Sequence, residues 1–237
     1  MNPALPASPG PRLAAKGPAR VPRWLKLAYS GFMAVLIPVY WDHYGPTNFL
    51  YFCDVALLLT LAALWWESPL LAGMAAVGIV VPQLFWALDF GARCLGLRLT
   101  GMTEYMFESQ RPLFTRGLSL FHGWLPFLLL YLVARLGYDR RALAAWCATG
   151  WALMLVAYCW MPAPGTVLAN PMHPVNINYV FGLSDDAPQR WMPPGAWLAL
   201  MMTGLPLLAW VPAHFALARL CGAPARAARG GVAAGRA

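Results

Sequence analysis

The sequence predicts an all-α fold: a polytopic membrane protein built as a bundle of six transmembrane helices. Of its 237 residues, 60% are hydrophobic and only 11% are charged, whereas an ordinary soluble domain has about 25% charged residues. The mean hydropathy is +0.54, which excludes a largely disordered chain as well. Apolar segments fill most of the chain, and each approaches the roughly 20 residues that a helix needs to cross a bilayer.

The six predicted spans follow one another between helix-breaking residues. Gly45-Pro46 ends the first span, Ser68-Pro69 separates the second from the third, Arg111-Pro112 precedes the fourth, Gly137 ends it, Pro162 ends the fifth, and Pro193-Pro194 precedes the sixth. The predicted spans are 24–41, 47–66, 70–90, 113–136, 142–161 and 196–220. Residues 24–220 are therefore predicted to form one transmembrane domain. We interpret 1–23 as a disordered basic cytoplasmic tail and 221–237 as a second basic cytoplasmic tail.

The basic residues divide unequally between the two sides of these spans. If both termini are cytoplasmic, the outer side holds five of the 17 Lys and Arg residues and the cytoplasmic side holds the other twelve. The positive-inside rule therefore favours this orientation. The tails, rich in Ala, Arg and Gly, favour the inner (cell) membrane of a bacterium. Because topology accounts for the net charge of +8, we expect membrane lipids as partners and no nucleic acid.

Polar residues gather in the outer half of the predicted bundle. Asp54, Gln83 and His122 come from three different spans, and a rise of 1.5 Å per residue puts each roughly 10 Å below the outer boundary. Asn48 and Asp89 are expected nearer the surface. Polar side chains inside a bilayer are costly. This cluster is therefore predicted to be an enzyme site, a proton or solute path, or a hydrogen-bonded network that locks helix packing.

Cys53 and Asp54 are alternative partners for His122. Neighbouring helical residues point about 100° apart, so both cannot face the imidazole directly. Either Cys53 is a nucleophile with His122 as its base, or Asp54 pairs with His122 and Cys53 packs as a small hydrophobic residue. The spacing of the five cysteines fits no zinc site, and we predict neither a metal nor a cofactor.

Two long outer connections, 91–112 and 163–194, are candidates for lids over a cavity. In the second, Asn176 and Asn178 alternate with apolar residues, so both amides share a face if the segment is extended. They are predicted either to bind a polar head group or to cap helix ends. Together with Asn48, Gln83 and Asp89, they complete the candidate substrate-binding residues.

The strings TNFLYFCDVALLLTL and SLFHGWLPFLL, within residues 47–135, resemble the YwaF-like integral membrane family. That family is related to transmembrane acyltransferases and, more distantly, to androgen-induced-gene type hydrolases of fatty-acid esters. The matching steps are Cys53-Asp54 and Phe121-His122-Gly123. The resemblance implies a six-helix bundle in which Cys53 is the nucleophile and His122 the base.

Two functions therefore remain open. The first is a membrane-embedded acyl hydrolase or acyltransferase that acts on lipid esters with the Cys53–His122 pair, with Asn48 or Gln83 near the oxyanion. The second is a non-catalytic membrane protein, a small-solute carrier or an assembly subunit. In that protein Asp54, Gln83 and His122 form a packing or proton-relay network.

Overall fold

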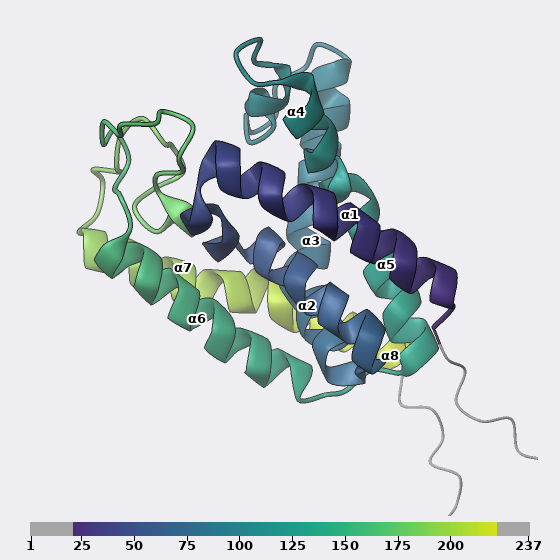
Figure 1. Cartoon of the computed structure of the whole chain (residues 1–237). Coiled ribbons are helices and arrows are strands. Elements are labelled where there is room, and N and C mark those ends of the chain that lie inside the picture. The colour runs from purple at the N-terminus through teal and green to yellow at the C-terminus, as the bar shows by residue number, and fades with distance from the viewer. Residues whose placement is uncertain (1–20, 222–237) are drawn as a thin grey trace, which may run out of the picture.

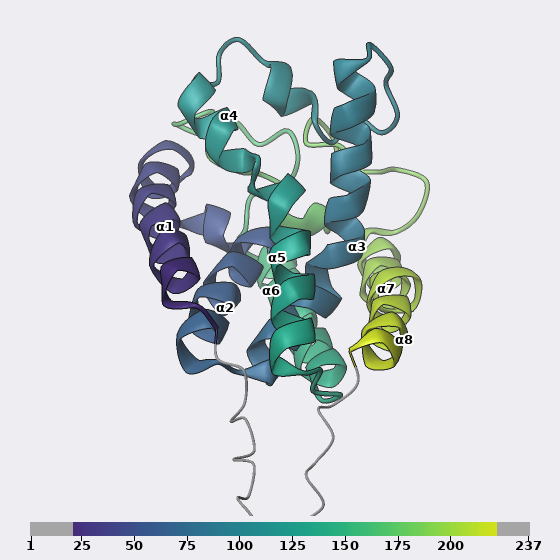
Figure 2. The ribbon, with the colours of Figure 1, turned by 90° about the vertical axis from the view of Figure 1, so that its right-hand side faces the viewer.

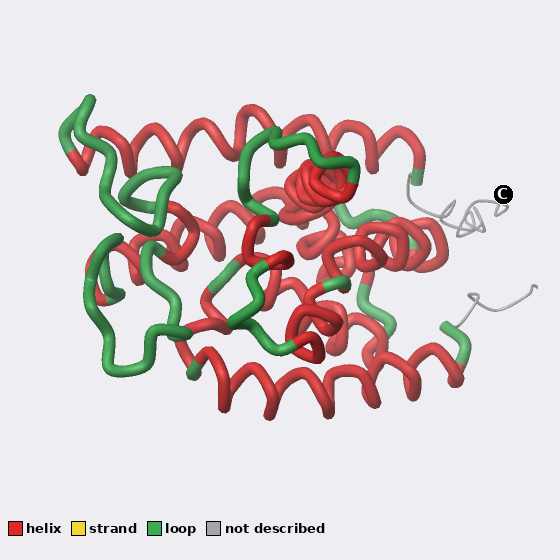
Figure 3. The backbone as a smooth tube through the Cα atoms, turned by 90° about the horizontal axis from the view of Figure 1, so that it is seen from above, coloured by secondary structure: helices red, strands yellow, loops and turns green. Residues whose placement is uncertain are grey.

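The computed structural model describes residues 21–221. The secondary structure of those residues consists of helices joined by loops, and no strand occurs among them (Figure 3). Of the predicted tails 1–23 and 221–237, residues 1–20 and 222–237 lie outside the described residues. The first predicted tail ends too late, because Val21 is already buried and α1 begins at Arg23. The elements are α1 (Arg23–Tyr44), η1 (Pro46–Leu50), α2 (Phe52–Trp66), α3 (Pro69–Cys94), η2 (Glu104–Phe107), α4 (Leu113–Ser119), α5 (Phe121–Leu136), α6 (Ala142–Trp160), η3 (Ile177–Tyr179), α7 (Pro194–Leu205), η4 (Pro206–Trp210) and α8 (Val211–Leu220).

Both ends of the described chain lie at the same end of the bundle. Glu67, in the α2–α3 turn, accepts hydrogen bonds from the Val21 N–H at 3.3 Å and from the Lys26 ammonium at 2.7 Å. At this end too, the Tyr138 N–H donates to the carbonyl of Cys221 at 3.2 Å. The helical segments therefore cross the bundle an even number of times.

The helix α3 is the centre of the bundle. It packs against α2, α5, α6 and α8, and Figure 2 shows it upright beside α5, with α2 on one side and α7 and α8 on the other. Within its most apolar stretch 61% of the residues are buried, against 28% in the corresponding stretch of α6. The central position is consistent with the mean hydropathy of α3, which at 1.9 is the highest among the four candidate spans of the described residues.

Four helical segments are long and apolar enough to cross a membrane. They are Pro69–Cys94, Leu113–Leu136, Ala142–Trp160 and Pro194–Leu220. Large apolar side chains on these segments are exposed, among them Phe85, Leu88, Phe127 and Leu208. An apolar exterior over an apolar core is what a bilayer requires and water does not tolerate. These observations support a membrane protein.

Three predicted spans are interrupted where the sequence indicated continuous helices, and in the sixth the π-helical segment η4 separates α7 from α8. The second is a 3₁₀-helix up to Leu50 and an α-helix only from Phe52, because Tyr51 is extended, with φ −63° and ψ 142°. The fourth breaks at Leu120. In α4 the hydroxyls of Thr115 and Ser119 bond to carbonyls of the preceding turn, which bends helices. Asp54 therefore lies in the first turn of α2, and His122 in the first turn of α5.

Candidate functional site

Asp54 and Gln83 are buried at nearly the same level of the bundle. They are 3% and 2% exposed. The helices α2 and α3 are antiparallel neighbours joined by Glu67 and Ser68. Counting equal numbers of residues back from Glu67 and forward from Ser68 brings Asp54 level with Val81, less than one turn from Gln83. The shared depth predicted for the carboxyl and the amide is therefore consistent with the register of α2 and α3.

The hydrogen bonding of these two side chains is incomplete. The Asp54 Oδ2 atom accepts from the Asn48 amide at 3.2 Å and from the Cys53 thiol at 3.6 Å. Among the described residues, nothing bonds to Asp54 Oδ1 or to either polar atom of the Gln83 amide, although all three atoms are buried. Leaving a buried polar group unpaired costs about 1–3 kcal/mol. A proton, a water or a ligand that bonds to these atoms would remove that cost.

His122 has its own set of contacts. Its Nδ1 atom donates to the Ser119 carbonyl at 2.8 Å, so Nε2 is the acceptor of the neutral ring. The imidazole is stacked on Trp86, with 4.9 Å between ring centroids, and on Phe121, with 4.0 Å. No hydrogen bond joins it to Cys53 or Asp54 in the described part of the chain. The thiol of Cys53 donates to Asp54 and not to His122.

Hydroxyl groups that the sequence did not single out connect these residues. The Tyr40 hydroxyl is 2.7 Å from the hydroxyl of Ser119, the residue whose carbonyl accepts from His122. On the other side, the indole of Trp86 donates to the Tyr105 hydroxyl at 3.2 Å. Burial raises the pKa of Tyr105 above its ordinary value, so this phenol stays neutral. The only sequence signal for these tyrosines was their position within or next to apolar segments.

An arginine lies over this network on the loop side. The guanidinium of Arg111 is 5.8 Å from the centroid of the Tyr44 ring and 5.6 Å from that of Tyr105. Its Nε donates to Glu108 at 2.8 Å. Arg111 therefore contacts both Tyr44 and Tyr105 while it is paired with Glu108.

Asp89 is fully engaged by the connection that follows α3. One carboxylate oxygen accepts from the Thr100 N–H at 2.7 Å, the Thr100 hydroxyl at 2.9 Å and the Gly101 N–H at 3.4 Å. The other accepts from the Thr103 N–H at 3.0 Å and the Thr103 hydroxyl at 2.6 Å. Asp89 thus holds a loop in place, and no carboxylate oxygen is left unbonded for a substrate.

The amides of Asn176 and Asn178 bond to the fold itself. The Asn176 Nδ2 atom donates to the carbonyls of Gly182 and Ser184, at 2.9 and 3.0 Å. The Asn178 Oδ1 atom accepts from the Phe52 N–H, and its Nδ2 donates to the Leu50 carbonyl, both at 3.0 Å. Asn178 therefore caps the start of α2. Of the two predicted roles for this segment, binding a head group or capping a helix end, the hydrogen bonds of Asn178 correspond to capping. Figure 1 shows the connection after α6 folded back beside the junction of α1 and α2.

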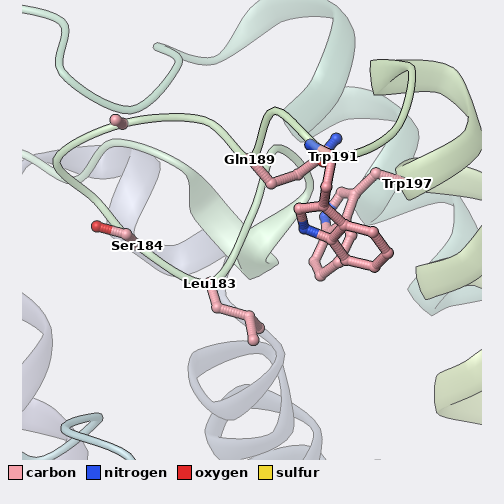
Figure 4. A pocket seen from close by; sticks show the side chains of 6 residues that line it. Leu183, Ser184, Gln189, Trp191 and Trp197 are labelled. Atoms are coloured by element: carbon pink, nitrogen blue, oxygen red, sulfur yellow. Dashed lines mark hydrogen bonds between the residues drawn. The ribbon is translucent and has the colours of Figure 1, made fainter.

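A surface pocket of about 290 Å³ lies in the same long connection, where Trp191 and Trp197 come together (Figure 4). The Gln189 amide at its edge is already bonded to the backbone of Trp191 and Met192. None of the predicted site residues lines this pocket. Across residues 21–221, no group of three or more His, Cys, Asp or Glu side chains could hold a metal ion.

Together the fold and the polar residues define an all-helical membrane protein with a buried carboxyl and amide. No family model, curated protein or solved structure matches the chain. The resemblance to the YwaF-like family remains a prediction.

Proposed function

We propose that this chain is a six-span protein of the bacterial inner membrane, with both termini in the cytoplasm. We further propose that it is non-catalytic and binds a small polar solute at Asp54 and Gln83. The even number of crossings supports the topology. The single observation that carries the function is the buried, unpaired Asp54 Oδ1, together with a wholly unpaired Gln83 amide at a similar level of the bundle.

The chemistry of these atoms defines the solute class. Asp54 Oδ1 and Gln83 Oε1 accept hydrogen bonds, and Gln83 Nε2 donates two. A small molecule that carries both donors and acceptors, such as one rich in hydroxyl groups, can satisfy all of them. Because ionising an isolated carboxyl among apolar groups is costly, Asp54 is expected to carry a proton when the site is empty and to lose it to water when a cationic solute binds.

Carbodiimide labelling tests the state of Asp54. Dicyclohexylcarbodiimide reacts with protonated carboxyls in apolar surroundings, so the purified protein should acquire one stable adduct, and peptide mass spectrometry should locate it at Asp54. The D54N variant should remain unlabelled. Asp89 is the matched control, since it is also 3% exposed but accepts five hydrogen bonds. Labelling at Asp89 in place of Asp54 would contradict the proposal.

Thermal unfolding then tests the solute. A compound that binds at Asp54 and Gln83 should stabilise the wild-type protein by about 2.7 kcal/mol when its concentration is 100 times its Kd. It should also slow carbodiimide labelling of Asp54. The Q83L variant should show neither effect, because it keeps the volume of the side chain and removes the amide. A solute that stabilises Q83L equally well would bind elsewhere.

Acyl transfer by Cys53 is the second candidate. One observation favours it: the Cys53 thiol already donates to a carboxylate oxygen of Asp54. The thiol proton would pass to that carboxylate or to His122, and sulfur would attack an ester carbonyl to give a thioester and release the alcohol. An acyl-directed covalent probe should then label the wild-type protein but neither C53A nor H122A. Equal labelling of the wild type and both variants would exclude this function.

A further inference from the structure

Two arginines at the loop-rich end of the bundle have no carboxylate partner in the described part of the chain. Arg93 lies in the last turn of α3, and its guanidinium is 5.3 Å from the centroid of the Phe107 ring. Arg116 lies in α4 and donates to the Met106 carbonyl at 3.0 Å. Phe107 and Met106 are neighbours in η2, so both guanidinium groups contact one short segment. Each also has a buried Nε with no acceptor.

The acidic groups of this region are already used. Glu104 pairs with Arg98 at 3.4 Å, and Glu108 pairs with Arg111 at 2.8 Å. Asp89, one turn before Arg93, is saturated by the Thr100–Thr103 turn. The charges of Arg93 and Arg116 are therefore available to an anion from outside the described residues.

The side chains around these arginines are apolar and exposed. Leu95 and Leu113 are 80% and 77% exposed, and Leu97 and Phe114 are exposed as well. Each lies two to four positions along the sequence from one of the two arginines. Apolar groups so arranged are favourable among lipid acyl chains, and an arginine beside them extends its charged end to the level of the phosphates.

We propose that Arg93 and Arg116 bind the phosphate of an anionic phospholipid in the leaflet at this end of the bundle. The planar guanidinium groups match phosphate oxygens in bidentate geometry. The four exposed apolar side chains would insert among the acyl chains beside it. This site uses no atom of Asp54 or Gln83 and does not depend on the solute proposed for them.

Native mass spectrometry of the full-length protein tests this site. Protein released from mixed micelles of phosphatidylglycerol and phosphatidylcholine should retain phosphatidylglycerol preferentially. The R93Q/R116Q variant should lose about tenfold or more of that binding, since hydrogen bonds to charged groups contribute about 1.5–3 kcal/mol each. The R93K/R116K variant should be intermediate, because it keeps the charges without the planar fork. R190Q, at an exposed loop arginine, should bind as the wild type does.

Four outcomes would count against the proposal. The first is unchanged phosphatidylglycerol retention in R93Q/R116Q, provided that its melting temperature in phosphatidylcholine shows it to be folded. The second is an equal loss in R190Q, which would indicate unspecific attraction to net charge. The third is displacement of the lipid by inorganic phosphate, which would assign the arginines to a free anion. A lower melting temperature for R93Q/R116Q in phosphatidylcholine alone would show a structural role and would also count against the site.

Discussion

Replacement of Gly78 by alanine should lower the melting temperature of the protein strongly. Gly78 lies in the middle of α3, and a Cβ built on it would collide with the indole ring of Trp146, at Cε2 and Cζ2. Trp146 is fully buried, and its ring also meets Phe52 and Trp210 at 6.0 and 6.1 Å. It has no space into which to retreat. Overpacking a core costs about 1–3 kcal/mol and sometimes more, and we expect the upper part of that range here.

Thermal unfolding of the purified protein in detergent measures this effect, with the yield of monodisperse protein as a second readout. G91A is the matched control in the same helix, because nothing lies within 4 Å of a Cβ at Gly91. Alanine is also the better helix former by about 1 kcal/mol, so G91A should be neutral or slightly stabilising. A smaller ring, in the double variant G78A/W146F, should recover part of the loss. Equal melting temperatures for G78A and G91A would refute the close approach of α3 and α6.

Replacement of Asn178 by alanine should release the start of α2 from the loop that caps it. The side chain satisfies the Phe52 N–H and the Leu50 carbonyl, and it is 3% exposed. Without it both backbone groups are unpaired, at about 1–3 kcal/mol each. Asn178 also has a positive φ of 58°, a conformation that costs a residue such as alanine about 1–2 kcal/mol. The expected loss is about 3–8 kcal/mol.

Two further variants separate these contributions. N178G accepts the positive φ but lacks the amide, so it should lose only the hydrogen-bond part. N178D keeps the acceptor for the Phe52 N–H and loses the donor to the Leu50 carbonyl. It should therefore keep one of the two hydrogen bonds and lose less stability than N178A. Hydrogen exchange in the peptide that contains residues 50–56 should accelerate most in N178A. Wild-type exchange and stability in N178G would show that the amide is not a cap.

The positions of the helices could be predicted closely from the sequence. The six expected segments coincide with helical segments of the structure to within a few residues at most ends, because Pro and Gly mark the breaks and apolar length fixes the rest. The length and hydropathy criteria for a span are met by four of them. The segment Arg23–Tyr44 carries charge near its start, and Phe52–Trp66 is short. Six spans therefore remain a proposal.

The candidate site was predicted only in part. Asp54 and Gln83 are buried at a similar level, as the count of residues along each helix indicated. Helix counting could not show that the Asp54 side chain bonds to Asn48 and Cys53, or that His122 bonds to Ser119. Those contacts depend on the breaks at Tyr51 and Leu120. The break at Tyr51 is held by Asn178, which is far along the chain, and the break at Leu120 follows hydroxyl groups that bond to the preceding turn. Hydropathy reports neither kind of contact.

By itself the sequence determined the class of this protein and the level of its polar residues. Apolar length, breakers and the distribution of charge act locally, so they can be read along the chain. Only the tertiary structure decided which polar atoms form hydrogen bonds within the fold and which have no partner among the described residues. Asp89 bonds to a loop and Asn178 bonds to the start of α2, whereas Asp54 and Gln83 keep unpaired atoms. Hydrogen bonding depends on partners brought together in space, and residues over a hundred positions apart in sequence meet only in the folded bundle.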